Sequence, residues 1–479
     1  MVNKQYDNLI TKWINENSSV ILERWMELIR IPSIKTEGKE NAPFGDNCAK
    51  ALKKSASFFS EDGFKTSLYE NDGYALAEYG SGEKSIGLFC HSDVVPVGED
   101  WIFTNPFEPI IKAGSLIGRG AEDNKSGIIA GMCVYKFFSD NGIPLKSTLK
   151  TFIGSDEECG MQDMEAYLKN HKIPDVSIVP DADFPCSVGE KGIYHIWLEH
   201  NNSFESVINF FGGEAFNIVL DRAQIEIRYC EKLFAELRGK IQDNSHFTLI
   251  KSDDKITLCA KGIAKHASIP EGSLNAAFII CELLCSCEFF NENDKAILSS
   301  ASILLCDYYG AGLECEHNDE NFGKLTCVNG MVKTESEKLS ISFDIRYGDT
   351  LDPLELVEKS TSAAQKHSFN VTFANNSPGF SIAKDSKIPD ALEEVFFEVT
   401  GDKLERVLMS GGTYARKLKN AFSIGTFYIT KDRKDNVLPM PDGHGGPHQC
   451  DERIDIEGFF MALRVLIHYI LRCDEIINT

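Results

Sequence analysis

The chain has 479 residues, with 49 Lys and Arg against 72 Asp and Glu, which gives a formal charge of −23. A chain of this length exceeds what one hydrophobic core normally holds, so two or more domains are expected. Apolar residues make up 43% of the chain and charged residues 25%, as in ordinary globular proteins. The strong negative charge disfavours nucleic acids and anionic membranes as partners.

Nothing in the sequence indicates a membrane or secreted protein. No stretch approaches the ~20 apolar residues that span a bilayer, and the first residues lack a signal-peptide pattern. The 15 cysteines are scattered without a Cys-x-x-Cys pair, which predicts free thiols rather than disulfides. We therefore expect a cytoplasmic protein.

The first 188 residues alternate between helical and strand patterns. Apolar spacing predicts helices over residues 7–30, 48–61, 125–138 and 163–170, and strands over residues 85–90, 148–153 and 176–179. Strands that alternate with helices predict the α/β class, with a mostly parallel sheet covered by helices on both faces.

The pattern changes between residues 189 and 383. Two strand pairs are expected, 247–252 with 255–260 and 325–333 with 338–347, and helices over 275–287 and 353–366. Beyond them a helix (388–399), a strand (421–428) and a helix (454–473) return to the α/β pattern. The sequence thus predicts a catalytic domain in two parts, 1–188 and 384–479, interrupted by an inserted α+β lid domain, 189–383.

Side chains that can bind a metal follow the predicted strands or precede a helix. Such side chains converge in an open α/β sheet, because loops from the carboxyl ends of parallel strands meet at one edge. Each one alone also fits a simpler interpretation, a charged surface turn or, for Asp123, a helix N-cap. Together they form a His/Asp/Glu set that suits one or two zinc ions: His91, Asp123, Glu158, Asp181 and His448.

These motifs resemble those of the co-catalytic di-zinc exopeptidases, a family that includes aminoacylases, succinyl-diaminopimelate desuccinylases, carnosinases and glutamate carboxypeptidases. Within it, the sequence most resembles the bacterial dipeptidase V branch of Xaa-His dipeptidases. The similarity runs from His91 to Glu452, almost the whole chain. It implies two Zn²⁺ ions, with Mn²⁺ or Co²⁺ as possible substitutes.

The resemblance also implies a role for each matching position. Asp123 would bridge the two ions, with His91 and Asp181 completing one site and Glu158 and His448 the other. Glu157 matches the general base that acts on a metal-activated water, and Asp93 the carboxylate behind the histidine ligand. In the inserted domain, His266 would stabilise the oxyanion and Arg346 would bind the substrate carboxylate. Further substrate contacts are implied for Asn217, Gly411, Gly412 and Thr413.

Three details depart from the family pattern or leave a choice open. Cys90 stands where the family commonly has glycine, so a thiol is expected near the metals. His444 competes with His448, which we prefer because Gln449 and Glu452 fit the pattern. Without the resemblance, Arg346 would be interpreted as a surface ion pair and His266 as a neighbour of a helix cap.

The leading hypothesis is a zinc dipeptidase that hydrolyses short peptides with a free N-terminus. The alternative is an N-acyl-amino-acid deacylase of the aminoacylase or desuccinylase type, which uses the same chemistry. A non-catalytic binding protein on the same scaffold is a third hypothesis. A small peptide is the expected ligand, and a monomer is favoured over a dimer.

Overall fold

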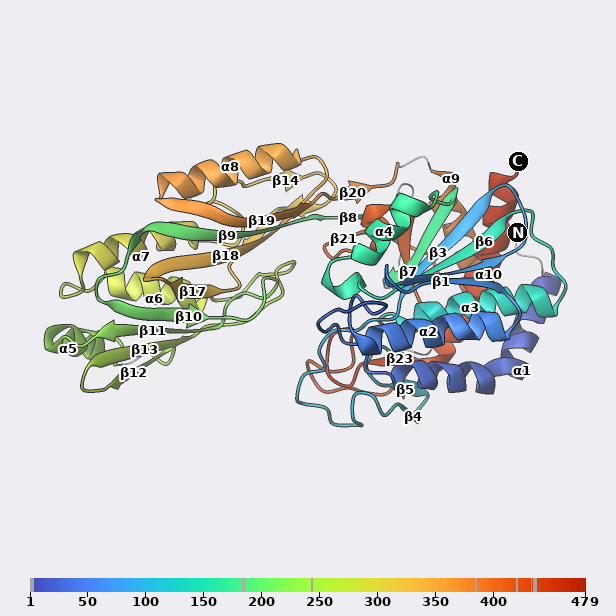
Figure 1. Cartoon of the computed structure of the whole chain (residues 1–479), viewed down its shortest axis with the longest axis horizontal. Coiled ribbons are helices and arrows are strands. Elements are labelled where there is room, and N and C mark those ends of the chain that lie inside the picture. The colour runs from blue at the N-terminus through green and yellow to red at the C-terminus, as the bar shows by residue number, and fades with distance from the viewer. Residues whose placement is uncertain are drawn as a thin grey trace. The chain divides into compact units, whose positions relative to one another are not determined.

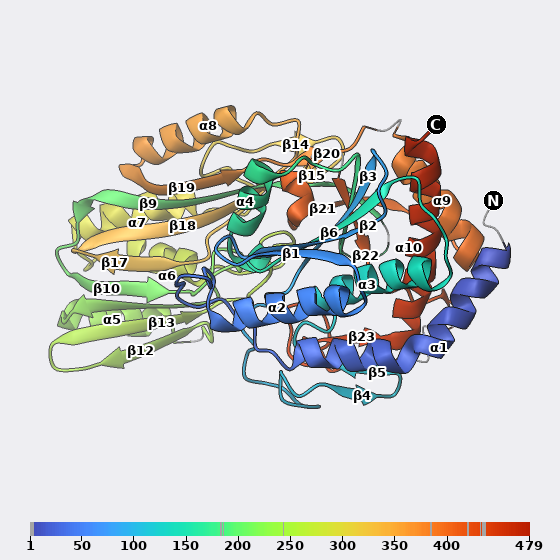
Figure 2. The ribbon, with the colours of Figure 1, turned by 45° about the vertical axis from the view of Figure 1, so that its right-hand side comes forward.

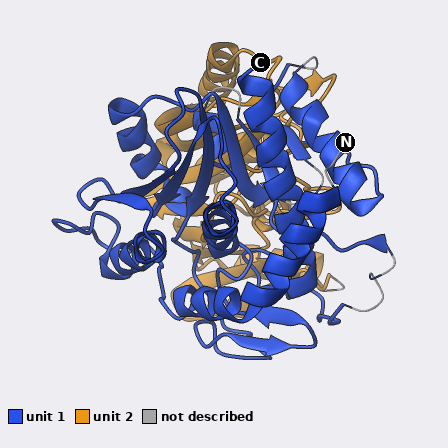
Figure 3. Ribbon diagram, turned by 90° about the vertical axis from the view of Figure 1, so that its right-hand side faces the viewer, with its two compact units in different colours: residues 1–189, 382–407, 413–479 blue, residues 190–381, 408–412 orange. Residues whose placement is uncertain are grey.

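A computed structural model describes residues 4–479 except 183, 185, 243, 384, 385, 419, 420, 432 and 434–436. The chain divides into two compact units: unit 1 comprises residues 1–189, 382–407 and 413–479, and unit 2 comprises 190–381 and 408–412. Figure 3 colours the two units. Within the described part of the chain, no helix is both long and apolar enough to cross a membrane.

Unit 1 is built on a sheet whose central strands are parallel. Strands β6, β3, β7 and β22 run parallel, and β2 and β8 flank them in the antiparallel direction. The order across the sheet is β1 (Lys65–Tyr69), β2 (Tyr74–Tyr79), β6 (Thr148–Gly154), β3 (Ser85–His91), β7 (Val176–Ala182), β22 (Ala421–Gly425) and β8 (Cys186–Glu190). A small antiparallel sheet joins β4 (Ile110–Lys112), β5 (Ser115–Ile117) and β23 (Arg453–Asp455).

Helices lie on both sides of this sheet (Figure 3). On one side the core contains Leu88 and Cys90 of β3 together with residues of the helices α1, α3 and α10; on the other, Phe89 contacts Tyr167 of α4. Helices α9 and α10 pack side by side (Figure 2). The bounds are α1 (Lys4–Ile29), α2 (Asp46–Glu61), α3 (Lys125–Asp140), α4 (Gln162–Asn170), α9 (Lys387–Thr400) and α10 (Ile456–Ile477). The predicted α/β class is confirmed.

Unit 2 is an antiparallel sheet with helices α5 (Glu231–Lys240), α6 (Ala276–Cys285), α7 (Glu292–Leu304) and α8 (Pro353–Lys366) (Figure 1). Side-chain caps begin three of these helices: Asn275 accepts the N–H of Phe278 at α6, Asn291 that of Asp294 at α7, and Asp352 that of Leu354 at α8. The strand order is β12 (Phe247–Lys251), β13 (Lys255–Lys261), β11 (Arg222–Arg228), β10 (Val207–Gly212), β17 (Val332–Glu335), β18 (Lys338–Tyr347), β9 (Gly192–Ser203) and β19 (Phe369–Ser377), with β16 (Thr326–Val328) beside β18.

One continuous strand was predicted over residues 325–333, and this prediction was wrong because the segment forms two strands, β16 and β17. The break falls at Gly330, where a side-chain Cβ would collide with the carbonyl oxygens of Ala215 and Phe216. The close approach of this loop leaves no room for a regular strand residue.

The short segment 408–412, which the sequence assigns to the catalytic domain, groups with unit 2. Two hydrogen bonds hold it there. Lys191 donates its backbone N–H to the carbonyl of Met409 (2.8 Å), and Arg346 donates from Nη1 to the carbonyl of Ser410 (3.1 Å). The unit to which such a short segment belongs is decided by its contacts with residues that are distant in the sequence.

Candidate metal centre and active site

Two histidines approach the two oxygens of one carboxylate in unit 1. Nε2 of His91, at the end of β3, lies 3.1 Å from Oδ1 of Asp123, and Nε2 of His448 lies 3.0 Å from Oδ2 of the same residue. Asp123 lies in the loop before α3, and His448 in the loop before β23. The fold therefore joins residues more than 300 positions apart.

Each histidine is close to a second carboxylate. Oδ2 of Asp181 is 3.4 Å from Nε2 of His91, and Oε2 of Glu158 is 3.1 Å from Nε2 of His448. The structure thus brings all five predicted ligand residues together in two groups that share Asp123. His91, Asp123 and Glu158 have donor atoms close enough to hold one metal ion, as do His91, Glu157 and Asp181.

The loop after β6 supplies adjacent carboxylates with different surroundings. Residues Glu157–Cys159 form a short 3-10 helix, which points the side chains of Glu157 and Glu158 in different directions. Oε2 of Glu157 lies 4.0 Å from Nε2 of His91. Glu157 is therefore next to the candidate metal ligands without being paired as closely as Glu158.

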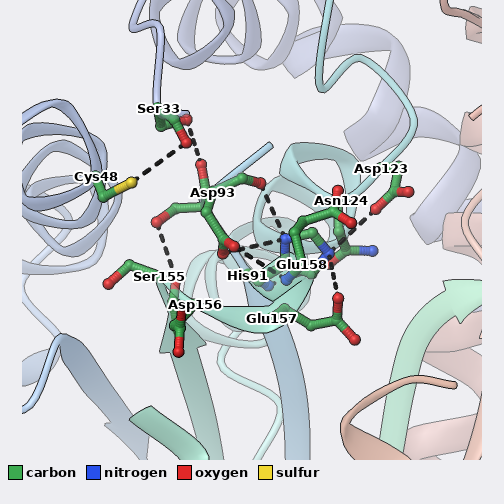
Figure 4. A network of polar contacts seen from close by, with 12 residues as sticks. Ser33, Cys48, His91, Asp93, Asp123, Asn124, Ser155, Asp156, Glu157 and Glu158 are labelled. Carbon is green, nitrogen blue, oxygen red and sulfur yellow. Dashed lines mark hydrogen bonds and ion pairs between the residues drawn. The ribbon is translucent and has the colours of Figure 1, made fainter. Parts of the chain in front are cut away.

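Asp93 connects the first histidine to the loop that carries Glu158 (Figure 4). Its backbone carbonyl lies 3.0 Å from Nδ1 of His91, and its Oδ1 is 3.4 Å from the same nitrogen. Its Oδ2 accepts the backbone N–H of Glu158 (3.1 Å). A carboxylate behind a ligating histidine fixes the ring orientation and its tautomer.

Burial and charge perturb the acids of this site in opposite directions. Burial raises the pKa of Glu157 well above its ordinary value, and burial together with the charge of Asp123 raises the pKa of Glu158 to about 7. Burial would also raise the pKa of Asp123, but hydrogen bonds from His448 and His91 outweigh it and lower that pKa. Shifts of this kind are typical of functional sites.

Several buried polar atoms in this cluster lack a hydrogen bond of good geometry: Nε2 of His91, Oδ1 of Asp93, and Oε1 of both Glu157 and Glu158. Unsatisfied buried carboxylate oxygens beside a second acid are costly unless a cation neutralises them. The donors are oxygen and imidazole nitrogen without sulfur, a set that suits zinc and similar divalent ions. The residues present therefore fit a divalent metal centre.

The simpler interpretation of Asp123 as a helix N-cap was wrong. The N-cap position of α3 is Asn124, not Asp123, because the chain enters the helix one residue later. The thiol of Cys90 lies in the hydrophobic core, since side chains alternate along β3 and place Cys90 on the opposite side from His91. His444 interacts with Asp451 instead, with Nδ1 2.7 Å from Oδ2.

Sequence reasoning noted Glu452 in the pattern after His448 but did not find that its carboxylate organises the loop of Asp123. Glu452, fully buried, accepts hydrogen bonds from Nη1 of Arg119 (2.7 Å) and from three backbone N–H groups, those of Gly120 (3.0 Å), Glu122 (2.9 Å) and Asp123 (3.1 Å). The signals in the sequence are an arginine between two glycines, Gly118 and Gly120, and the pattern position of Glu452.

Asp163 organises the loop of Glu157 in a similar way. Its buried carboxylate accepts the backbone N–H groups of Ser155 (2.7 Å) and Asp156 (3.0 Å) and the hydroxyl of Tyr414 (2.6 Å). Burial raises the pKa of Asp163 to about 7. This contact has no signal in the sequence, because Asp163 stands at the start of a helix, where acidic residues are common.

The predicted residues His266 and Asn217 lie together in unit 2. Ala267 donates its N–H to the carbonyl of Asn217 (2.8 Å), and Ile218 forms a β-bridge with His266. Nδ1 of His266 accepts the N–H of Ser268 (3.2 Å), which leaves the hydrogen of a neutral ring on Nε2.

Arg346 is buried with 5% exposure, so the interpretation as a surface ion pair was wrong. Gly411 and Gly412 fall in unit 2 beside Ser410, whose carbonyl accepts from Arg346. Thr413 falls in unit 1 and uses its hydroxyl locally: Oγ1 accepts the N–H of Ala415 (3.1 Å) and lies 2.9 Å from Oγ of Ser423.

The fold and this site define an α/β enzyme with a cluster of histidines and carboxylates at the carboxyl ends of parallel strands. Residues 87–472 match the peptidase family M20/M25/M40, and the chain belongs to this family and is a hydrolytic peptidase. The family predicted from the sequence motifs is thereby confirmed.

Named relatives agree with this placement. A Staphylococcus aureus (strain USA300) protein named "Putative dipeptidase" is 27% identical over 461 residues, which cover 92% of this chain and 94% of the relative. The structure of human carnosine dipeptidase 1 superposes with a TM-score of 0.61 at 13% identity and covers 98% of this chain and 99% of that one. The dipeptidase Dug1p from Saccharomyces cerevisiae gives 0.59 at 12% identity, with 98% of each chain covered. At these identities the two structures show the shared fold.

Proposed function

We propose that this peptidase is a zinc-dependent dipeptidase that acts on short peptides with a free N-terminus. The observation that carries the proposal is the pairing of His91 and His448 with opposite oxygens of Asp123, each backed by a further carboxylate. That arrangement suits two divalent ions with Asp123 between them. The names of the relatives, which include dipeptidases, favour a dipeptide substrate.

We assign the first ion to His91, Asp181 and Asp123, and the second to His448, Glu158 and Asp123. Divalent ions held by these residues would lower the pKa of a bound water and polarise the scissile carbonyl. Asp93 keeps the ring of His91 oriented, since its backbone and side-chain oxygens both approach Nδ1.

Glu157 acts as the general base and then as the general acid. Burial raises the pKa of its carboxyl group. Glu157 can therefore take a proton from the attacking water and return it to the leaving nitrogen. Unlike Glu158, it is free of a close histidine partner, since its nearest approach to His91 is 4.0 Å.

We assign binding roles to residues of unit 2. Nε2 of His266 donates to the oxyanion of the tetrahedral species. Arg346 holds the substrate carboxylate: of its five N–H groups, Asp344 uses two and Ser410 one, which leaves two for a two-pronged hydrogen bond. Asn217, Gly411, Gly412 and Thr413 complete the proposed substrate-binding set.

The proposal is tested with purified protein supplied with two equivalents of Zn²⁺. A panel of unblocked dipeptides is compared with N-acyl amino acids that share the same C-terminal residue. We expect the dipeptides to be hydrolysed with the larger kcat/KM. Hydrolysis of the N-acyl amino acids alone would overturn the dipeptidase assignment in favour of a deacylase.

A further inference from the structure

The register of two strands in unit 2 places a histidine opposite the partner of Arg346. Strands β9 and β18 are antiparallel, and their register pairs His195 directly with Asp344. Asp344 and Arg346 are two positions apart on β18, so their side chains share one face of the sheet. Directly opposed residues have Cβ atoms about 5 Å apart. His195, Asp344 and Arg346 therefore form one contiguous group.

Asp344 is fully buried and interacts with both neighbours. Nε and Nη2 of Arg346 donate to its two oxygens, at 2.6 and 2.8 Å. Nε2 of His195 lies 3.1 Å from Oδ2, the oxygen that also accepts from Nη2. An ionised carboxylate only accepts hydrogen bonds, so Nε2 of His195 carries the hydrogen.

The need to neutralise the charge of Asp344 does not explain why His195 also binds it. Arg346 already supplies a full positive charge through two hydrogen bonds, and an arginine is always protonated. A further donor on Oδ2 restrains the plane of the carboxylate, and through it the plane of the guanidinium. His195 thereby limits the directions in which the two remaining N–H groups of Arg346 can point.

The face of the His195 ring makes a second contact. It stacks on Phe216, with ring centroids 4.6 Å apart and planes inclined by 18°, and Trp197 meets Phe216 edge to face at 5.9 Å. Phe216 directly precedes Asn217, whose carbonyl accepts the N–H of Ala267. The stacked ring therefore supports the segment that joins Asn217 to His266.

We propose that His195 is a positioning residue that links the two substrate-binding elements of unit 2. Its Nε2 edge orients Arg346 through Asp344, and its ring face holds Phe216 and the adjoining Asn217. This inference rests on the proposed function, in which Arg346 binds the α-carboxylate of the substrate. It assigns to a partly exposed histidine a role in selecting substrates with a free C-terminus.

The test separates the two contacts with two substitutions. His195→Phe keeps a ring over Phe216 and removes the N–H to Asp344, whereas His195→Gln keeps an N–H at a similar reach and removes the ring. A cleaved substrate is compared with its C-terminal amide, which lacks the carboxylate. We expect His195→Phe to raise the KM of the free acid about tenfold, with kcat within about twofold, and to leave the KM of the amide unchanged.

His195→Gln should recover most of the preference for the free acid over the amide. His246→Phe, at an exposed histidine of unit 2 that bonds the carbonyl of Lys261, serves as the matched control and should behave as wild type. An unchanged KM in His195→Phe, or equal rises for acid and amide, would overturn the proposal.

The failure of the proposed function has a different signature. It would be seen in the wild-type protein, as hydrolysis of N-acyl amino acids but not of dipeptides. N-acyl amino acids also carry a free α-carboxylate. The effect of His195→Phe is then measured on an N-acyl amino acid and on its C-terminal amide. The role of His195 is decided in either case.

Discussion

Glu452 accepts the backbone N–H of Asp123 through Oε1 at 3.1 Å, across 329 positions of the sequence. The same side chain lies four residues after His448, so it connects the loops that carry both residues. Arg119 completes the arrangement from the other side, with Nη1 2.7 Å from Oε2. The distance between Asp123 and His448 is thus fixed by a buried ion pair whose two members are not among the proposed ligands.

Glu452→Gln should weaken metal binding without removing a proposed ligand. The amide retains one acceptor oxygen for the N–H groups of Glu122 and Asp123, but it presents an NH₂ group to Gly120 and Arg119. A buried charge left without its partner costs about 3–5 kcal/mol. We expect at least a tenfold loss in zinc affinity and a lower unfolding temperature, measured by competition with a chelator dye and by calorimetry.

Glu457→Gln is the matched control for that change, since Glu457 is exposed and lies in the first turn of α10. It should retain wild-type zinc affinity. Equal zinc affinity in Glu452→Gln and Glu457→Gln would contradict the role given to Glu452.

Substitution of the adjacent acids should separate chemistry from metal binding. Glu157→Ala is expected to lower kcat by a factor of about 10² to 10⁴, the usual contribution of a general base, while the zinc content stays near two equivalents. Glu158→Ala removes the carboxylate 3.1 Å from His448 and should lower the zinc content itself. Steady-state kinetics measure kcat and elemental analysis measures the zinc content of each variant. Normal turnover by the Glu157→Ala protein would exclude Glu157 as the general base.

Gly154→Ala should destabilise unit 1 because there is no space for a side chain at the end of β6. An added Cβ would collide with the hydroxyl of Tyr414 and with Oδ2 of Asp163. Overpacking of this kind costs about 1–3 kcal/mol. Chemical denaturation should show the loss, and adding Tyr414→Phe should recover part of it because the colliding oxygen is removed.

Gly131→Ala is the control for this prediction. It lies within α3, where the nearest atoms to an added Cβ are 3.5 Å away, an ordinary contact distance. This variant should be at least as stable as wild type, since alanine favours a helix over glycine. A Gly154→Ala protein as stable as wild type would contradict the prediction and show that Tyr414 moves to make room for the added Cβ.

The ion pair of Asp344 and Arg346 should make a pH-dependent contribution to stability. Burial raises the pKa of Asp344, but the charge of Arg346 and the hydrogen bond from His195 outweigh it and lower the pKa from 3.8 to about 2. An acid with a lower pKa in the folded state stabilises the protein above its unfolded pKa, and this contribution is lost as the pH falls toward 2.

Asp344→Asn should therefore lower the free energy of unfolding by about 3 kcal/mol at pH 7, with the difference from wild type shrinking between pH 4 and pH 2. Urea unfolding at several pH values measures the difference. Asp253→Asn, at an exposed turn residue, should show no difference at any pH. A difference for Asp344→Asn that stays constant down to pH 2 would rule out the ion pair as its source.

Much of the fold follows from local patterns. The helix predicted over residues 353–366 has the bounds of α8, since Asp352 and Pro353 are strong start signals, and most other predicted helices and strands agree within a few residues. The helices α5 and α7 were missed, as were several strands, among them β1, β2, β9, β10, β11 and β19. The pairing of β9 with β18 and β19, whose residues follow far along the chain, carries no local signal.

The residues that the structure brings together in the candidate site could be named from the sequence, because motifs at strand ends and helix starts are local: His91, Asp123, Glu157, Glu158, Asp181 and His448. The residues that support these side chains became visible in the folded chain. Glu452 binds the loop of Asp123, and Asp163 binds the hydroxyl of Tyr414, in both cases through hydrogen bonds between segments that are distant in the chain. His195 contacts Asp344 through strand register. Such contacts depend on packing and on the need to satisfy buried charges, and neither leaves a pattern in neighbouring residues.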